Sequence, residues 1–213
     1  MANVKLYNIK WKVDTAGPSP DCNERSEVFF FGCDRAMQGN PCKGCFNHNI
    51  WDSSVCTIEH SVDEMVNNIE KFAPNKYITI GGGEPTAQFD ALIELTEKLK
   101  AKGFHIMVYT WKSLKETNNP KFLQLIKNID ILVDGEFKKE ECLYNEDKGD
   151  GFLSSVGSGN QIIWDCKEYN DNNINIIKGF AMRELQGLAL DNNDRLIYFL
   201  KDKNNYKEEA FVF

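Results

Sequence analysis

Two loops, each placed directly after a short apolar run, most constrain what this chain can fold into. The first loop, Cys33 to Asn47, carries three cysteines and follows the apolar run Ser26 to Gly32. The second loop, Gly81-Gly82-Gly83-Glu84-Pro85, is rich in glycine and follows the apolar run Tyr77 to Ile80. Short apolar runs bounded by loops are typical of buried strands. We therefore expect each loop to leave the carboxyl end of a buried strand.

Amphipathic segments between the apolar runs predict helices. Ser61 and Glu64 form a capping box ahead of an apolar face that extends to about Phe72. A second helix is predicted over Asp90 to Lys102, where Gly103 ends it. The pattern continues with a strand at Phe104 to Tyr109, a helix at Pro120 to Asn128 and a strand at Ile131 to Val133. This alternation predicts an α/β fold with right-handed crossovers and a parallel sheet, in which ligands collect at the carboxyl ends of the strands.

The pattern is weaker beyond Lys138. Residues 140–158 are polar and rich in glycine, Gln161 to Trp164 and Arg195 to Leu200 predict further strands, and the Asn/Asp cluster at 170–174 is interpreted as a solvated loop. A chain of 213 residues with 42% apolar content is long enough for one core and short for two. We expect a single domain over 1–213, with its core at about 25–165 and a C-terminal extension at about 166–213.

Composition limits the classes of partner. The net charge of -7 leaves no basic stripe to displace phosphate counterions, which argues against broad nucleic-acid binding. No run approaches the eighteen or so apolar residues of a membrane span, and the N-terminal stretch is too polar for a signal peptide. Seven cysteines, an odd number, favour thiols or metal ligands over a disulfide framework. We expect a cytoplasmic protein that acts on a small molecule or another protein, and neither a nucleic-acid nor a membrane partner.

The spacing of the three cysteines indicates a metal centre. Cys42 and Cys45 are close enough to bind one centre, and Cys33 reaches it if the eight intervening residues fold back. Three thiolates leave a tetrahedral metal one ligand short, whereas a four-iron cluster held by three cysteines keeps one iron open for a substrate or cofactor. The alternatives are a structural zinc site completed by His48 or Cys56, and a redox pair formed by the Cys-x-x-Cys alone.

The glycine-rich loop favours an ammonium ligand over a phosphate. A dinucleotide-binding fingerprint needs glycine at the sixth position, which is Thr86 here, and Glu84 would repel a phosphate. A carboxylate beside exposed glycine backbone suits the headgroup of an amino acid. The simpler interpretation is a tight turn that carries a surface glutamate.

The three-cysteine cluster after the first strand and Gly82-Gly83-Glu84-Pro85 after the next resemble the radical S-adenosylmethionine superfamily. Within it, the chain is most similar to the activating enzymes of anaerobic (class III) ribonucleotide reductases. That likeness spans roughly residues 25–165 and rests on Arg25, Cys42 to Asn47, Trp51-Asp52, Val133 to Phe137 and Gly157 to Gln161. Three features depart from the family, one of which is the looser segment Gly17 to Glu24 ahead of Arg25. Eight residues instead of three separate the first two cysteines, and Ile162 stands where the family tends to have arginine.

The resemblance implies a partial (β/α) barrel of about five to six strand-helix units, with a [4Fe-4S] cluster bound by Cys33, Cys42 and Cys45. It also implies S-adenosylmethionine as the second cofactor, with its ammonium held by Gly82, Gly83 and Glu84. Thr110 or Asp134 would contact the ribose, and Asn160 and Gln161 would lie near the adenine; an Asp134-Gly135 turn is the simpler interpretation of that pair. No catalytic residue is assigned beyond the cluster. The remaining cysteines are expected to be ordinary thiols, at Cys22, Cys56, Cys142 and Cys166.

The activity implied by the resemblance is reductive cleavage of S-adenosylmethionine to a 5′-deoxyadenosyl radical, which generates a glycyl radical on a partner reductase. The implied partners are the large subunit of an anaerobic ribonucleotide reductase and a flavodoxin-like or ferredoxin-like electron donor. One alternative is a radical enzyme that acts on a small molecule or peptide, such as a deazaguanine synthase-like protein or a peptide maturase. An alternative of another class is a non-catalytic zinc or iron-sulfur module.

Overall fold

The computed structural model describes residues 2–13, 17–20, 24–56, 59–142, 157–172 and 175–212. Cys22 and most of the polar segment 140–158 lie outside the described residues. The described strands are β1 (Asn3–Val4), β2 (Leu6–Val13), β3 (Arg25–Phe30), β4 (His60–Ser61), β5 (Tyr77–Gly82), β6 (His105–Tyr109), β7 (Ile131–Asp134), β8 (Ile162–Asp165), β9 (Ile176–Ala181), β10 (Leu185–Leu190), β11 (Leu196–Leu200) and β12 (Glu208–Val212). The described α-helices are α1 (Asp34–Met37), α2 (Val62–Phe72), α3 (Phe89–Ala101), α4 (Lys121–Asn128) and α5 (Cys166–Asn172).

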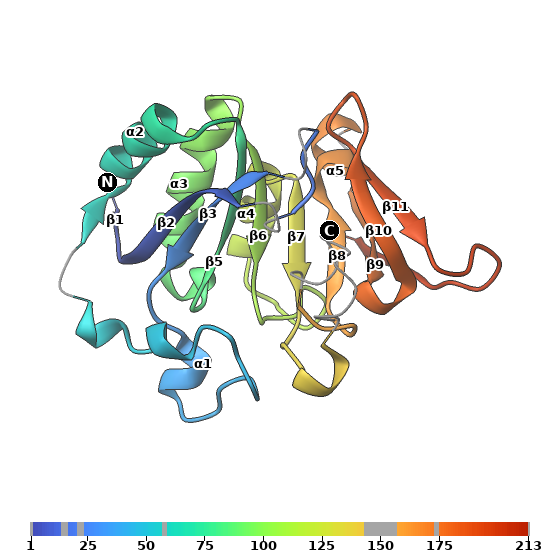
Figure 1. Ribbon diagram of the computed structural model, residues 1–213, viewed down its shortest axis with the longest axis horizontal. Coiled ribbons are helices and arrows are strands. Elements are labelled where there is room, and N and C mark those ends of the chain that lie inside the picture. Colours follow the sequence, from blue (N-terminus) through green and yellow to red (C-terminus); the bar gives the residue numbers. More distant parts are fainter. Residues whose placement is uncertain are drawn as a thin grey trace.

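An eight-stranded mixed sheet forms the centre of the molecule (Figure 1). Its order is β12-β9-β8-β7-β6-β5-β3-β2, and the four strands β3, β5, β6 and β7 are parallel to one another. Helices α2, α3 and α4 connect these parallel strands in turn, because each crossover must return the chain to the same end of the sheet. The predicted α/β class is confirmed. Beyond β7 the strands β8, β9 and β12 pair antiparallel, so the described parallel part has four strands.

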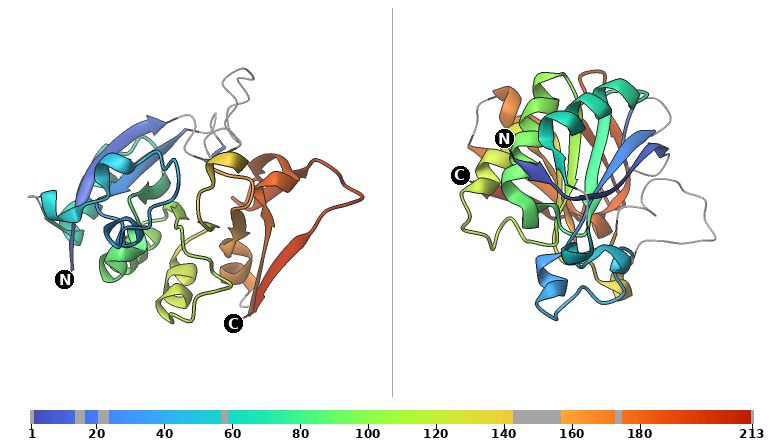
Figure 2. Two further views of the ribbon diagram at one scale, coloured as in Figure 1. Left: turned by 90° about the horizontal axis from the view of Figure 1, so that it is seen from below. Right: turned by 90° about the vertical axis from the view of Figure 1, so that its left-hand side faces the viewer.

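Helices α2, α3, α4 and α5 all cover one face of the sheet (Figure 2). Along β3, the side chains of Val28 and Phe30 point to that face and are fully buried in the main core, together with Ile78, Ile80 and Leu132 of the neighbouring strands. Since side chains alternate along a strand, the intervening residues of β3 and β5 point to the opposite face. That opposite face is where a cavity can form.

The opposite face is covered unevenly. A second apolar core joins Met107, Val133 and Phe180 of the sheet to Leu188 and Leu196 of the β10-β11 hairpin. The hairpin thus covers the sheet over β6 to β9, on the right-hand side of Figure 1. The β3 and β5 part of the same face lies outside this second core, and the cavity described below is found there.

Several predicted elements are confirmed closely. Helix α2 begins after Ser61, whose Oγ accepts a hydrogen bond from the Glu64 N–H at 3.2 Å as the capping box requires. Helix α3 ends before Gly103, which has a φ of 77°. The strands predicted at Gln161 to Trp164 and Arg195 to Leu200 are present as β8 and β11 within one residue at each end.

The interpretation of 170–174 as a solvated loop is wrong for its first part, because α5 extends through Asn172. The Asp165 carboxylate starts this helix by accepting hydrogen bonds from the N–H groups of Lys167 and Glu168, at 3.0 and 3.2 Å. Local polarity suggested a loop, and the cap at Asp165 overrides it. Strand β2 was not predicted, because its exposed edge position gives it a polar sequence and its pairing with β3 is irregular.

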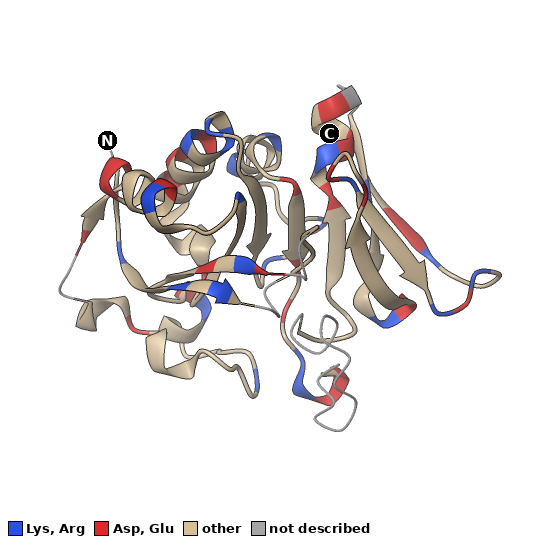
Figure 3. Ribbon diagram, turned by 45° about the horizontal axis from the view of Figure 1, so that its top comes forward, with Lys and Arg blue, Asp and Glu red and all other residues tan. Residues whose placement is uncertain are grey.

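Charged residues of both signs are interspersed on the helices that cover the sheet (Figure 3). Several form ion pairs between neighbouring helices, such as Lys98 with Asp63 at 2.5 Å. Such exposed pairs contribute little to stability individually. No helix in the described part of the chain is both long and apolar enough to cross a membrane. The cytoplasmic location stays a prediction.

Candidate active site

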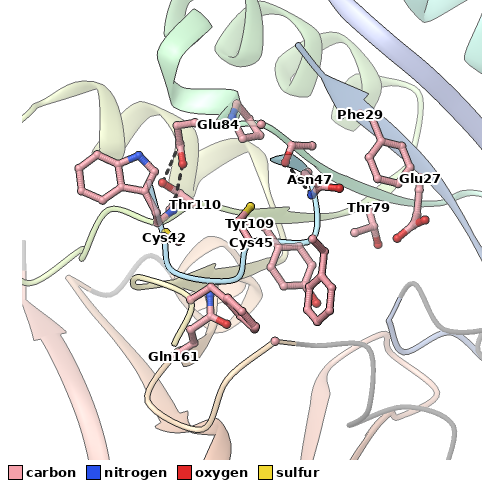
Figure 4. Close-up of a pocket in the computed structure, with 18 of the residues that line it drawn as sticks. Glu27, Phe29, Cys42, Cys45, Asn47, Thr79, Glu84, Tyr109, Thr110 and Gln161 are labelled. Atoms are coloured by element: carbon pink, nitrogen blue, oxygen red, sulfur yellow. Dashed lines mark hydrogen bonds between the residues drawn. The ribbon is translucent and has the colours of Figure 1, made fainter. Parts of the chain in front are cut away.

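A cavity of about 200 Å³ lies on the sheet face opposite the helices, beside the carboxyl ends of β5 and β6 (Figure 4). Both loops that follow the first apolar runs contribute to its wall. The cysteine loop provides Cys42, Cys45 and Asn47, and the glycine loop provides Gly81 through Pro85. Residues far apart in the sequence therefore meet where a parallel sheet is expected to place its ligand site.

The cysteine loop leaves β3 through Gly32 and is fixed by backbone hydrogen bonds. Gly32 has a φ of 93°, and the N–H groups of Gly32 and Cys33 each donate at 2.8 Å, to the carbonyls of Ile50 and Trp51. Cys33 then precedes the short helix α1, and the Cys45 N–H donates to the Cys42 carbonyl in a turn at 3.2 Å. These hydrogen bonds hold the start of the loop beside Ile50 and Trp51 and form a tight turn between Cys42 and Cys45.

The three cysteines differ in their surroundings. Cys42 and Cys45 line the cavity, whereas Cys33 is buried and borders a second cavity on the outer side of the loop, next to Met37 and Ser53. Among the described residues, no three His, Cys, Asp or Glu side chains lie close enough together to hold one metal ion. The ligand set Cys33, Cys42 and Cys45 therefore stays a prediction.

The thiols themselves suit an iron-sulfur cluster. Burial raises the pKa of Cys33 to about 11 and also raises the pKa of Cys42, so both are protonated at neutral pH without a metal. Metal binding would release these protons, because thiolate is the ligating form. Thiolate donors on a loop that lines a cavity match the chemistry of iron-sulfur ligation. The donor set fits a cluster at the end of the cavity near Cys42 and Cys45.

The glycine loop is held against the start of the cysteine loop by its backbone. The Gly83 N–H donates to the Phe30 carbonyl at 2.9 Å, and the Glu84 N–H donates to the Gly32 carbonyl at 2.7 Å. A Cβ added at Gly83 would lie 2.1 Å from the carbonyl oxygen of Gly32, and one at Gly82 would lie 2.5 Å from backbone atoms of Phe30. These glycines are required because two backbones approach each other there.

Glu84 is a buried connector between the glycine loop and β6. Its Oε1 accepts from the Thr86 N–H at 3.0 Å, from the Thr110 hydroxyl at 2.8 Å and from the Thr86 hydroxyl, and its Oε2 accepts from the Trp111 N–H at 2.9 Å. Burial raises the pKa of Glu84, and these hydrogen bonds oppose that rise. Among the described residues, Oε2 has a single donor and keeps capacity for another. Contact with a ligand ammonium stays a prediction.

Thr110 and Asp134 were both expected at the ribose, and the structure places them differently. Thr110 is buried, lines the cavity and donates to Glu84. Asp134 lies outside the cavity lining, because it shares the helix-covered face with Leu132. Its carboxylate accepts from the Leu114 N–H and from Trp164 Nε1, and burial raises its pKa to about 6. Its ribose contact stays a prediction, and the neighbouring Gly135 lines the cavity instead.

Asn160 and Gln161 hold the loop that follows β7. Gln161 lines the cavity, and its Nε2 donates to the Gly135 carbonyl at 2.9 Å. Asn160 lies outside the cavity lining, and its Nδ2 donates to the Glu136 carbonyl at 2.9 Å. The expected position near an adenine stays a prediction for both. In the described structure they connect the start of β8 to the exit of β7.

Sequence analysis missed two kinds of site residue. Asn47 links the two loops, because its Nδ2 donates to the Gly82 carbonyl at 2.7 Å. Glu27, Phe29, Thr79 and Tyr109 line the far part of the cavity from within the strands. Their signal was the period-2 alternation of the strands, which assigns them to the face opposite Val28 and Ile78.

Comparison with known proteins agrees with the cysteine and glycine loops. A family model described as a 4Fe-4S single cluster domain matches residues 23–164. The anaerobic ribonucleoside-triphosphate reductase-activating protein of Vibrio cholerae is 27% identical over 167 residues, which cover 74% of this chain and 96% of that protein. The expected likeness and the expected cluster are confirmed.

Pyruvate formate-lyase-activating enzymes are also similar, over a shorter stretch. That of Staphylococcus epidermidis is 32% identical over 100 residues, and that of Staphylococcus aureus is 33% identical over 102 residues. Each match covers 43% of this chain and 40% of the staphylococcal enzyme. The prediction of an enzyme related to activating enzymes is confirmed.

Proposed function

Because the chain belongs to the 4Fe-4S single cluster domain family, we propose that it is a radical S-adenosylmethionine activating enzyme that generates a glycyl radical on an anaerobic ribonucleotide reductase. The main support for this proposal is the composition of the cavity wall. Cys42 and Cys45 share a cavity wall with Gly82 and Gly83, so a cluster and an amino-acid headgroup can be adjacent there. The likeness that covers 96% of an anaerobic reductase-activating protein supports this choice of partner.

The two cofactors, when bound, would supply the 5′-deoxyadenosyl radical that removes a hydrogen atom from glycine. The protein binds and orients them. Asn47 fixes the Gly82 carbonyl, and Glu84 fixes Thr110 against the glycine loop, so that the ligand meets a preformed wall. Phe46 and Phe137 pair with their ring centroids 5.0 Å apart and add apolar surface to the cavity wall.

A partial (β/α) barrel and a single domain, both implied by the resemblance, are part of the proposal. The four parallel strands and the helices between them are consistent with a partial (β/α) barrel. Strands β9 and β12 of the C-terminal extension join the same sheet as β8, which supports a single domain over 1–213. A flavodoxin-like or ferredoxin-like protein would deliver the electron to the cluster.

The test is electron paramagnetic resonance on the reductase. Anaerobically reconstituted protein, reduced and mixed with S-adenosylmethionine and its cognate reductase, should produce a persistent glycyl radical signal. The matched control is the same reductase with its acceptor glycine changed to alanine, which should give no signal. A protein that turns over a small metabolite or peptide many times, without a radical on the reductase, would contradict the proposal and favour the small-substrate alternative.

A further inference from the structure

The far end of the cavity carries a carboxylate that none of the expected cofactor contacts uses. Glu27 lines the cavity from β3, where it is the register partner of Thr79 on β5. Phe29 is the partner of Gly81 in the same ladder, so Glu27 lies two residues further from the glycine loop, about 7 Å along the strand. Figure 4 shows Glu27 and Thr79 together, away from Cys42 and Glu84.

Glu27 is not neutralised by the cations near it. Lys10 is its register partner on β2, but the Lys10 ammonium lies over the Phe29 ring, 4.8 Å from its centroid. Arg25 directs its N–H groups to the Thr79 hydroxyl, the carbonyls of Pro18, Ile78 and His105, and the His105 ring. Among the described residues, Glu27 therefore has neither a hydrogen bond nor an ion pair.

Glu27 is only half-buried and has no partner among the described residues, so its carboxylate is free to accept a hydrogen bond from a ligand that enters the cavity. Burial raises the pKa of Glu27, and the charge of Lys10 partly opposes that rise. The ligand must donate a hydrogen bond, since an ionised carboxylate only accepts. The expected cofactor contacts gather at the opposite end of the cavity, around the cysteine and glycine loops. The remaining occupant of a cavity in an activating enzyme is the segment of the partner that enters it.

We propose that Glu27 is a specificity-determining residue that accepts a hydrogen bond from an N–H donor on the substrate segment of the partner protein. The donor is a peptide N–H or a cationic side chain that flanks the acceptor glycine. This inference rests on the proposed function, because it assigns the far end of the cavity to a protein substrate. It makes Glu27 a contact for the substrate and leaves the cofactor contacts unchanged.

The test compares Glu27→Gln with Glu24→Gln in the reconstituted holoenzyme. Both changes remove one carboxylate, but Glu24 lies outside the cavity lining and its side chain faces Lys12 at 3.7 Å. Initial rates of glycyl radical formation, measured against reductase concentration, give KM and kcat. We expect Glu27→Gln to raise the KM for the reductase about tenfold or more, with kcat and the Kd for S-adenosylmethionine unchanged. Glu24→Gln should change none of them.

Two further measurements keep the outcome unambiguous. If Glu27→Gln does not retain its iron, Glu27→Asp, which keeps the charge on a shorter side chain, is compared in the same way. The salt dependence of KM separates the two donor sources: a slope that Glu27→Gln reduces identifies a cationic side chain, and a slope that Glu27→Gln leaves unchanged identifies a peptide N–H.

An unchanged KM in the Glu27 variants, with a normal radical yield, would overturn this inference and leave the proposed function intact. A weakened Kd for S-adenosylmethionine would also overturn it, because Glu27 would then belong to the cofactor site. If the unaltered protein forms no glycyl radical on the reductase, the proposed function and this inference both fail.

Discussion

The parallel half of the sheet and its antiparallel half serve different purposes. Strands β3, β5 and β6 end in the loops that line the cavity, whereas β8, β9 and β12 continue the sheet, and β9 and β12 contribute nothing to the cavity lining. The β10-β11 hairpin covers β6 to β9 on the same face, and leaves β3 and β5 open to the cavity. A ligand site is therefore expected where parallel strands end together, and the added antiparallel strands complete the rest of the core.

The largest expected difference between the halves concerns the cysteines. Single alanine replacements of Cys33, Cys42 or Cys45 should abolish the cluster, because a site held by three thiolates has no spare protein ligand. Cys166→Ala, at the start of α5 in the antiparallel half, should retain about four irons per chain, as should Cys22→Ala, Cys56→Ala and Cys142→Ala. Iron and sulfide analysis after anaerobic reconstitution measures this. The ligand assignment is wrong if Cys56 proves indispensable for iron and Cys33 does not.

The next largest difference between the two halves should be the effect of replacing a glycine on stability and iron content. Gly83→Val would place Cβ against the Gly32 backbone, so we expect a loss of roughly 3 kcal/mol in stability and less bound iron. In the hairpin, a Cβ at Gly187 meets the Phe199 ring at an ordinary 3.7 Å, and Gly187→Val should change stability by only about 0.5 kcal/mol. Denaturant unfolding and iron content measure both. Equal effects would show that the glycine loop is not fixed against the cysteine loop.

Glu84 should affect the binding of the cofactor. Replacing it with alanine removes one acceptor from Thr110 and Trp111 and leaves the glycine loop without its connection to β6. We expect the affinity for S-adenosylmethionine to fall about ten- to a hundredfold, which corresponds to roughly 1.5–3 kcal/mol for a hydrogen bond to a charged group. Glu208→Ala, at the surface of β12 beside Lys178, is the matched control and should leave affinity unchanged. Unaltered affinity in Glu84→Ala would remove Glu84 from the cofactor site.

A smaller effect is expected in the antiparallel half, where the free energy of unfolding should depend on pH through Asp165. Burial raises the pKa of Asp165 to about 6, above its ordinary value of 3.8. The folded protein therefore keeps a proton that the unfolded chain releases, so this contribution to stability is complete below about pH 4 and is lost as pH rises through about 6. Asp165→Asn can still accept hydrogen bonds at the start of α5 but does not titrate. Between pH 5 and 7 the free energy of unfolding should therefore fall by about 1 kcal/mol less in Asp165→Asn than in the unaltered protein. Identical pH dependence in both proteins would contradict this assignment.

The parallel half was predictable because its signals are local. The short apolar runs, the capping box at Ser61 and Gly103 after α3 each specify an element without reference to distant residues. The two loops were predictable as a site for the same reason, since their residues stand directly after strands.

The antiparallel half and the inner contacts of the site were harder to predict. Whether β8 pairs parallel or antiparallel with β7 depends on how the chain returns after β7, and no local sequence pattern predicts the antiparallel pairing that is found. The resemblance assigned Asp134 and Glu84 to ligands, yet both carboxylates accept hydrogen bonds from the protein itself. Only the folded structure reveals such partners. Glu27 was missed because a single charged residue in an apolar strand has no motif of its own.

The most direct test of the account is the transfer of hydrogen from the reductase to the cofactor. The cognate reductase, prepared with glycine deuterated at Cα, is mixed anaerobically with the reduced protein and S-adenosylmethionine. Mass spectrometry of the 5′-deoxyadenosine formed should show one deuterium atom, and none when the acceptor glycine of the deuterated reductase is changed to alanine. Formation of unlabelled 5′-deoxyadenosine with the deuterated, unaltered reductase would contradict the claim that this protein takes a hydrogen atom from a glycine of that partner.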